Sequence, residues 1–168
     1  DYLTYDTTNT YDLIIGNPPY YVMKKDNVDS SYYDYFDGRP NIFILFIIKS
    51  LGLLNDNGIL SFVLPKSFLN CLYYDKTRKY ILNNFKILQI LECNDVYIDT
   101  KQTTIILVLQ KTDDVVNNEF ILDNGSYTMF GTPENVKKLR SLYDGSSTLK
   151  KSGFKVNVGN VVWNQCKA

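Results

Sequence analysis

The sequence contains no histidine, and this absence limits the chemistry available to the chain. Histidine is the side chain that most readily exchanges a proton near neutral pH, and it is a frequent metal ligand. Acid–base catalysis by imidazole and metal binding by histidine are therefore excluded for these 168 residues. We predict no metal site.

Cysteine is scarce as well. The three cysteines, Cys71, Cys93 and Cys166, are scattered and odd in number. This pattern suits neither a disulfide framework nor a zinc site, and it favours a reducing compartment. We therefore expect a cytoplasmic protein.

Long apolar runs and a net charge are also missing. The longest apolar run, from Ile42 to Ile48, is too short to cross a bilayer, so no membrane partner is expected. The chain has 18 basic and 18 acidic residues, but they are unevenly distributed. Residues 1–40 hold seven acidic and three basic side chains, whereas residues 133–168 hold two acidic and seven basic ones. The basic end is compatible with binding a phosphate backbone, and equally with a solvated helix face.

The most informative stretch of the sequence runs from Tyr11 to Tyr20. Its apolar residues Leu13 to Ile15 predict a strand of a parallel sheet, buried on both faces. Gly16 allows a sharp turn, and the prolines Pro18 and Pro19 make the next residues stiff. The result would be a rigid loop at the carboxyl end of a strand, where open α/β sheets bind their ligands.

This loop carries groups that suit the recognition of an amine on a flat ring. The side-chain oxygen of Asn17 and the carbonyl of Pro18 can accept both hydrogens of an exocyclic amino group. The ring of Tyr20 can stack on the base that bears the amine. A proline-rich turn after a core strand is the plain alternative. With these four residues, Asn17-Pro18-Pro19-Tyr20, the sequence resembles amino-methyltransferases that use S-adenosylmethionine, above all the N6-adenine DNA methyltransferases of restriction-modification systems.

The resemblance implies roles for further residues. The catalytic group would be Asn17 with Pro18, Pro19 and Tyr20. The cofactor S-adenosylmethionine would be bound by Asp1, which matches a family aspartate upstream of the motif, and by Asn17. In the loop between the last two strands, Tyr97 would form the second wall of the base pocket, and Lys101 would touch a phosphate. Tyr97 as a half-buried loop aromatic is the simpler interpretation.

The order of elements predicts an α/β fold. Residues 13–15, 59–64, 86–93 and 103–109 are expected strands, and helices are expected after Asn41 and after Ser67 as N-caps. The last connection is too short for a helical crossover, so the final strand should be antiparallel. This corresponds to the second half of a Rossmann-like methyltransferase sheet, followed by a small α+β extension with a hairpin and a helix that begins at Thr132 and Pro133.

The family's glycine-rich cofactor loop is absent, since no G-x-G-x-x-G pattern occurs. We therefore expect a fragment or one piece of a split enzyme, with the N-terminal half of the catalytic domain as a partner in cis or as a second chain. The expected division is the C-terminal half of the catalytic domain in residues 1–111, an extension and linker in 112–151, and the start of a target-recognition domain in 152–168. DNA is the expected substrate, and a restriction nuclease is a candidate partner.

Three functions compete at this point. The first is methylation of adenine in DNA, after the base has been flipped out of the duplex. The second keeps the motif but changes the substrate to a glutamine side chain or a guanine amine in RNA. The third is an inactive fragment that supports DNA binding or assembly. Tyr97 and the basic C-terminal extension favour the first.

Overall fold

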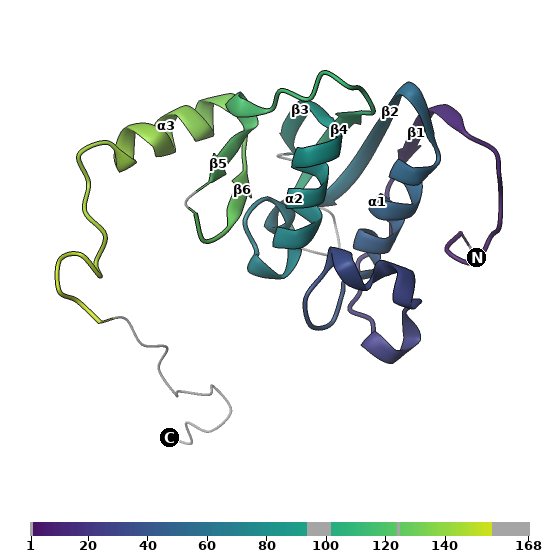
Figure 1. Ribbon diagram of the computed structural model, residues 1–168, viewed down its shortest axis with the longest axis horizontal. Helices are drawn as coiled ribbons and strands as arrows, with labels where there is room; N and C mark the ends of the chain where they lie inside the picture. Colours follow the sequence, from purple (N-terminus) through teal and green to yellow (C-terminus); the bar gives the residue numbers. More distant parts are fainter. Residues whose placement is uncertain (1, 94–101, 124, 156–168) are drawn as a thin grey trace.

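The computed structural model describes residues 2–93, 102–123 and 125–155. They are arranged around a four-stranded sheet, whose strands are labelled in Figure 1. The strands are β1 (Tyr11–Gly16), β2 (Leu54–Pro65), β3 (Lys86–Cys93) and β4 (Thr104–Gln110), in the order β1-β2-β4-β3. β1 and β2 are parallel, and β4 is antiparallel to both β2 and β3. The predicted antiparallel final strand is confirmed.

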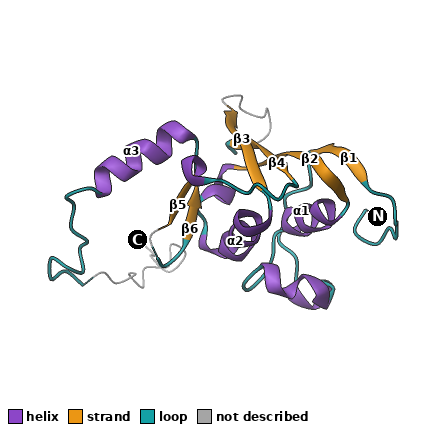
Figure 2. Cartoon of the chain, turned by 45° about the horizontal axis from the view of Figure 1, so that its top comes forward, coloured by secondary structure: helices purple, strands orange, loops and turns teal. Residues whose placement is uncertain are grey.

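One face of the sheet is covered by two helices, α1 (Ile42–Gly52) and α2 (Asp75–Asn84), which lie on the same side (Figure 2). Alternate strand residues point toward them and form the core, because successive side chains of a strand face opposite ways. The core members with the lowest exposure include residues of α1, α2, β2, β3 and β4: Phe43, Ile44, Ile47, Leu51, Leu54, Leu60, Leu64, Ile81, Ile87, Ile105 and Leu109.

The opposite face of the sheet is not covered by the described residues. In β1, the side chains of Leu13 and Ile15 are 55% and 70% exposed. The expectation that this strand is buried on both faces is therefore wrong for this chain. The physical reason is that β1 forms an edge of the sheet, paired with β2 alone among the described strands, and carries no helix on that face.

Residues 55–58, which precede the expected strand at 59–64, also lie inside β2. The chain bulges here, because Tyr11 pairs with Leu54 whereas Leu13 already pairs with Ile59. Asn57 takes the left-handed conformation, with φ of 64°. A Cβ on Gly58 would lie 2.8 Å from the Asn55 carbonyl oxygen, so the bulge requires glycine at this position.

Helix starts were predicted with mixed success. Asn41 occupies the N-cap position of α1, but its side chain makes no capping hydrogen bond. Ser67 does not cap α2: the stretch that follows β2 forms two 3₁₀ turns, η3 (Lys66–Leu69) and η4 (Leu72–Tyr74), and α2 begins only at Asp75. In the loop after β1, two further 3₁₀ turns, η1 (Lys25–Asn27) and η2 (Ser30–Tyr35), pack onto α1 around Val28, Phe36 and Leu45.

The extension packs onto the sheet unit. It contains η5 (Asn118–Phe120), the predicted hairpin of β5 (Ile121–Asp123) and β6 (Thr128–Phe130), and α3 (Pro133–Tyr143), whose first turn is capped by Thr132 as predicted. Phe120, Ile121 and Phe130 belong to the same core cluster as the sheet. The division of the chain into domains stays a prediction. In the part of the chain that the structure describes, no helix is long and apolar enough to cross a membrane.

Candidate active site at the carboxyl end of β1

The loop of Asn17 to Tyr20 follows directly on β1 and is fixed from both sides. At its start, a Cβ on Gly16 would lie 3.1 Å from the ring of Phe62, so the backbone runs close to the neighbouring strand β2. Pro18 is buried. The structure thus contains the predicted loop at the carboxyl end of a parallel strand.

Tyr20 holds the far end of the loop. Its ring is half-buried and meets the fully buried Phe43 of α1 edge-on, with ring centroids 6.1 Å apart. Its hydroxyl oxygen lies 2.7 Å from Asn17 Oδ1 and 2.8 Å from the Val63 carbonyl oxygen of β2. The tyrosine therefore links the loop to both α1 and β2.

Asn17 is exposed although its neighbours are held in place. Its amide is neutral, so at this position it can orient a substrate amine by accepting a hydrogen bond without taking a full proton. The resemblance pairs this amide with the Pro18 carbonyl. The two groups are adjacent in the loop, and that joint role stays a prediction.

A cavity of about 260 Å³ opens beside Asn17. Its wall includes Tyr2, Ile14 and Phe46. The Tyr2 ring lies 5.0 Å from that of Phe46, and its hydroxyl is 2.8 Å from Ser50 Oγ. The N-terminal segment is thereby anchored on α1 next to the loop. Asp1 itself lies outside the described residues.

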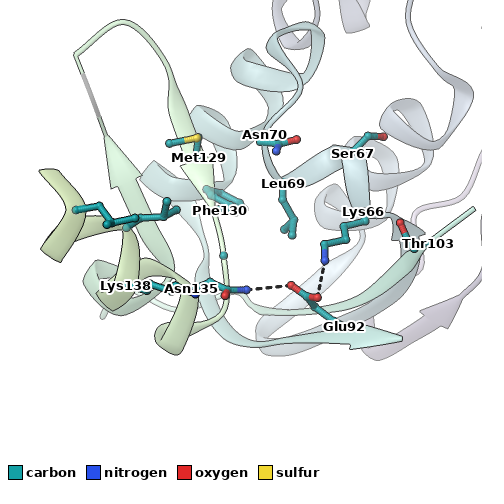
Figure 3. A pocket seen from close by; sticks show the side chains of 13 residues that line it. Lys66, Ser67, Leu69, Asn70, Glu92, Thr103, Met129, Phe130, Asn135 and Lys138 are labelled. Atoms are coloured by element: carbon teal, nitrogen blue, oxygen red, sulfur yellow. Dashed lines mark hydrogen bonds and ion pairs between the residues drawn. The ribbon is translucent and has the colours of Figure 1, made fainter. Parts of the chain in front are cut away.

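A second cavity, of about 450 Å³, lies where β2 and β3 end, between η3 and the extension (Figure 3). Here Glu92, near the end of β3, forms an ion pair with Lys66 and accepts a hydrogen bond of 3.0 Å from Asn135 of α3. Both carboxylate oxygens are thus engaged, which makes Glu92 a poor general base. Lys138 also lines this cavity.

Sequence reasoning did not single out these residues. Lys66 offers one usable signal, because it follows β2 as Asn17 follows β1, and parallel strands end at the same edge. Glu92 and Asn135 are far apart in sequence and belong to different layers, so no local pattern joins them.

The segments that follow β2 are held by Arg78 of α2, whose side chain is fully buried. Its guanidinium donates to the carbonyls of Phe68, Cys71 and Thr128 at 2.6–2.9 Å. Burial lowers the pKa of Arg78, and the nearby Asp75 carboxylate opposes this shift. The side chain therefore ties η3 and the start of η4 to the hairpin of the extension.

Several predicted site residues are not tested by this geometry. Tyr97 and Lys101 lie outside the described residues, as does Asp1. The structure brings together Asn17, Pro18, Pro19 and Tyr20, and the pocket between Tyr20 and Tyr97 stays a prediction. Within the described ranges, no group of histidine, cysteine, aspartate and glutamate side chains is arranged to hold a metal ion.

Comparison with known proteins decides the family. The family model of the Eco57I restriction-modification methylases matches residues 2–98. The chain belongs to this family. The match includes the whole loop from Asn17 to Tyr20, and it confirms the restriction-modification resemblance drawn from these residues.

Two methyltransferases are among the relatives of the chain. The type II methyltransferase M.AccI of Acinetobacter calcoaceticus is 27% identical over 126 residues, which cover 70% of this chain and 23% of that protein. The modification methylase CviBIII of Paramecium bursaria Chlorella virus NC1A is 29% identical over 86% of this chain and 36% of its own length. The chain thus spans less than half the length of these relatives.

The fold has relatives among solved structures. A Listeria monocytogenes protein assigned to the class I S-adenosylmethionine-dependent methyltransferases superposes with a TM-score of 0.59 at 22% identity, covering 68% of this chain and 36% of that one. At this identity the likeness concerns the fold alone. It confirms the predicted Rossmann-like fold for the sheet.

Proposed function

We propose that this chain forms the C-terminal half of the catalytic domain of a DNA methyltransferase that acts on the exocyclic amine of adenine. The observation that carries the proposal is Asn17, exposed at the carboxyl end of β1 on a loop fixed by Phe62 and Phe43. Membership in the restriction-modification methylase family and the methyltransferase names of the relatives support this reaction class.

The chemistry follows from the electronic structure of the amine. The nitrogen lone pair of adenine is delocalised into the ring, so the nitrogen is a poor nucleophile. Acceptance of its hydrogens by Asn17 Oδ1 and the Pro18 carbonyl would localise the lone pair on the nitrogen. This is catalysis by positioning and electrostatics, and it requires no strong base before methyl transfer. The absence of histidine is therefore compatible with the reaction.

The cofactor supported by the fold is S-adenosylmethionine, which supplies an electrophilic methyl group when bound. The cavity lined by Tyr2, Ile14, Asn17 and Phe46 suits one wall of such a site, because it offers an aromatic ring, apolar side chains and one amide. Asp1 would add a hydrogen-bond acceptor for the cofactor's adenine. The rest of the site would come from an N-terminal half, in cis or as a second chain.

An adenine inside a duplex cannot reach a loop of this kind, so the base would be flipped out. The ring of Tyr20 and that of Tyr97 would hold it, and stacking of this kind contributes roughly 1–3 kcal/mol per base. Lys101 would contact a phosphate. Residues 112–151 would serve as an extension and linker, and residues 152–168 as the start of a target-recognition domain.

The cellular setting is part of the proposal. Few cysteines and the family's restriction-modification role support a cytoplasmic enzyme that acts beside a restriction nuclease. Methylation of a glutamine side chain or of RNA guanine is the competing function, and an inactive fragment is the third. The first two functions predict different methylated products in the experiment below, and the third predicts none.

The test is Asn17→Ala in the complete enzyme that contains this chain. We expect methyl incorporation into DNA to fall by a factor equivalent to about 2.7–4 kcal/mol of barrier, since one stabilising contact is lost. The measurement is radiolabelled methyl transfer to DNA, followed by mass spectrometry of the digested nucleosides, which should contain N6-methyladenine.

The matched control is Asn83→Ala, at an exposed position near the end of α2. It removes the same amide far from the loop and should retain full activity. Normal activity of the Asn17→Ala enzyme would contradict the assignment. A methylated protein or RNA, with unmodified DNA, would favour the competing substrates.

A further inference from the structure

The hydroxyl of Tyr20 lies between two oxygen atoms, although it has a single proton to donate. It is 2.7 Å from Asn17 Oδ1 and 2.8 Å from the carbonyl oxygen of Val63. Both are acceptors, and one O–H group can make a full, linear hydrogen bond to only one of them. In this arrangement one of the two oxygens receives a weaker hydrogen bond.

The Val63 carbonyl is the acceptor that most needs the proton of the Tyr20 hydroxyl. The ladder between β1 and β2 ends with the pair of Gly16 and Phe62. Val63 is therefore the first residue of β2 beyond the part that pairs with β1. The loop has already turned away at this point, and the hydroxyl of Tyr20 takes the place of a strand neighbour. A partly buried carbonyl is costly to leave without a partner.

A half turn of the Asn17 amide removes the conflict. The turn exchanges its nitrogen and oxygen, which occupy nearly equivalent positions. Asn17 Nδ2 then donates to the Tyr20 oxygen, and the Tyr20 hydroxyl donates to the Val63 carbonyl. Both contacts become full hydrogen bonds, and Asn17 Oδ1 points outward to solvent.

We propose that the Tyr20 hydroxyl is a positioning group that sets which atom of the Asn17 amide faces the substrate. The relay runs from Asn17 Nδ2 to Tyr20 and from Tyr20 to the Val63 carbonyl, and it leaves Oδ1 free to accept a hydrogen from the substrate's amine. Its geometric part depends only on this loop and on Val63 of β2, whereas its catalytic consequence rests on the proposed function.

The relay works because Tyr20 is itself immobilised. Its ring packs edge-on against Phe43, which is fully buried in α1, and Val63 belongs to the middle of the sheet. The hydroxyl is therefore a fixed point from which the amide is oriented. An amide turned the other way would present N–H groups to a substrate amine, donor against donor, and would not draw its hydrogens.

The decisive experiment is a double-mutant cycle in the complete enzyme, with Tyr20→Phe, Asn17→Asp and both together. A carboxylate has oxygen at both positions and therefore no orientation to set. We expect Tyr20→Phe to lower kcat between about 10-fold and 100-fold beside asparagine, as misorientation of a catalytic group does. In the Asn17→Asp background, the same change should have a much smaller effect.

Two further readouts separate positioning from support of the ring. Tyr20→Phe keeps the aromatic ring, so KM for DNA and the fluorescence of 2-aminopurine at the target position should stay close to wild type. In the protein without substrate, selective ¹⁵N-asparagine labelling should show the Asn17 side-chain amide as hydrogen-bonded, and this signature should disappear in Tyr20→Phe. The side-chain signal that is missing from the spectrum of Asn17→Asp identifies the resonance of Asn17.

The matched control is Tyr33→Phe, which removes another tyrosine hydroxyl that donates to a backbone carbonyl, that of Lys25, on the exposed surface. It should leave kcat unchanged. Equal losses from Tyr20→Phe in both backgrounds, or an amide signal unchanged by Tyr20→Phe, would overturn the relay. Because Asn17→Ala tests the proposed function separately, an active Asn17→Ala enzyme would refute that function whatever the cycle gives.

Discussion

At the scale of single residues, Arg78 shows how one buried cation organises loops that have no regular structure. Its guanidinium contacts carbonyls from three separate segments, at Phe68, Cys71 and Thr128. Asp75 provides the nearby negative charge, 3.6 Å from the third nitrogen. A buried charge is tolerated only with such partners.

We expect Arg78→Met to destabilise the fold by about 3–5 kcal/mol, because buried carbonyls from three segments lose their donor and the Asp75 carboxylate loses one of its two nearby cations. Urea unfolding measures the change. The matched control is Arg140→Met: Arg140 also bridges two carbonyls, of Asn118 and Ile121, but at an exposed site where water can replace it. Equal losses for the two variants would show that burial of Arg78 adds nothing.

The sequence was enough to single out Asn17 and Tyr20, but it could not predict which residues they contact. The motif fixes Asn17 and Tyr20 as a pair three positions apart, and the resemblance assigns them to catalysis. The contact between Tyr20 and Val63 depends on β2 lying beside β1, which is a property of the sheet. For the same reason, the link of Lys66, Glu92 and Asn135 has no signature in the sequence.

At the scale of elements, the first turn of α2 carries a pH-sensitive contact with the extension. Burial alone would raise the pKa of Asp75, but hydrogen bonds from Lys79 and from the Thr128 amide, with the charges of Lys79 and Arg78, outweigh it and lower this pKa below its ordinary 3.8. The helix N-terminus also favours a carboxylate at this position. The ionised form of Asp75 is therefore the one that the fold prefers.

The sign of the pH effect follows from this direction. Stability from Asp75 is fully present above its ordinary pKa and is lost as the pH falls through the lower pKa of the folded state. We expect Asp75→Asn to be less stable than wild type at neutral pH, with a difference that shrinks below pH 3.8. Urea unfolding across pH measures it. Asp37→Asn, whose ion pair with Lys76 is exposed, should show hardly any change.

The predicted role of Tyr97, in the loop between β3 and β4, rests on the sequence and the resemblance. If Tyr97 stacks on a flipped adenine, the ring matters and the hydroxyl does not. Tyr97→Phe should keep base flipping, as measured by 2-aminopurine fluorescence, while Tyr97→Ala should lose most of it. Flipping at the wild-type level in Tyr97→Ala would remove Tyr97 from the base pocket.

Element boundaries were predicted correctly where turn and cap residues close in sequence set them. The predictions failed where contacts with residues farther away in the chain set them. The hairpin of β5 and β6, and the start of α3 at Thr132 and Pro133, follow from turn and cap residues close in sequence. The start of α2 was missed because the residues before it are held as 3₁₀ turns by Arg78, from a later element. The bulge at Gly58 was missed because it depends on the approach of Tyr11.

At the scale of the whole molecule, the sheet is covered on one face and open on the other (Figure 2). The open face carries apolar side chains from β1 and β3, including Ile15 at 70%, Leu91 at 42% and Leu88 at 38% exposure. Beside it, β1 presents an edge to which another strand can add, with no proline or charge among Leu13, Ile14 and Ile15 to prevent pairing. Exposed apolar area of this kind marks an interaction surface.

We expect the 168-residue chain alone to bind S-adenosylmethionine very weakly, to methylate nothing and to self-associate. An N-terminal half, supplied in cis or as a second chain, would cover the open face and complete the cofactor site. Calorimetry with the cofactor and size-exclusion chromatography test both statements. A monomer with micromolar affinity for the cofactor would mean that the chain needs no such half.

A charge on the open face should have opposite effects in the two contexts. In the isolated chain, Ile15→Lys should raise the monomer fraction, because a lysine on an edge strand opposes pairing. In the complete enzyme, the same lysine would be buried without a partner and should lower both stability and activity. The control is Leu142→Lys on α3, where a leucine is 62% exposed at a position outside the sheet, and it should be neutral in the complete enzyme. If Ile15→Lys were neutral there as well, the open face of β1 would not be where the N-terminal half docks.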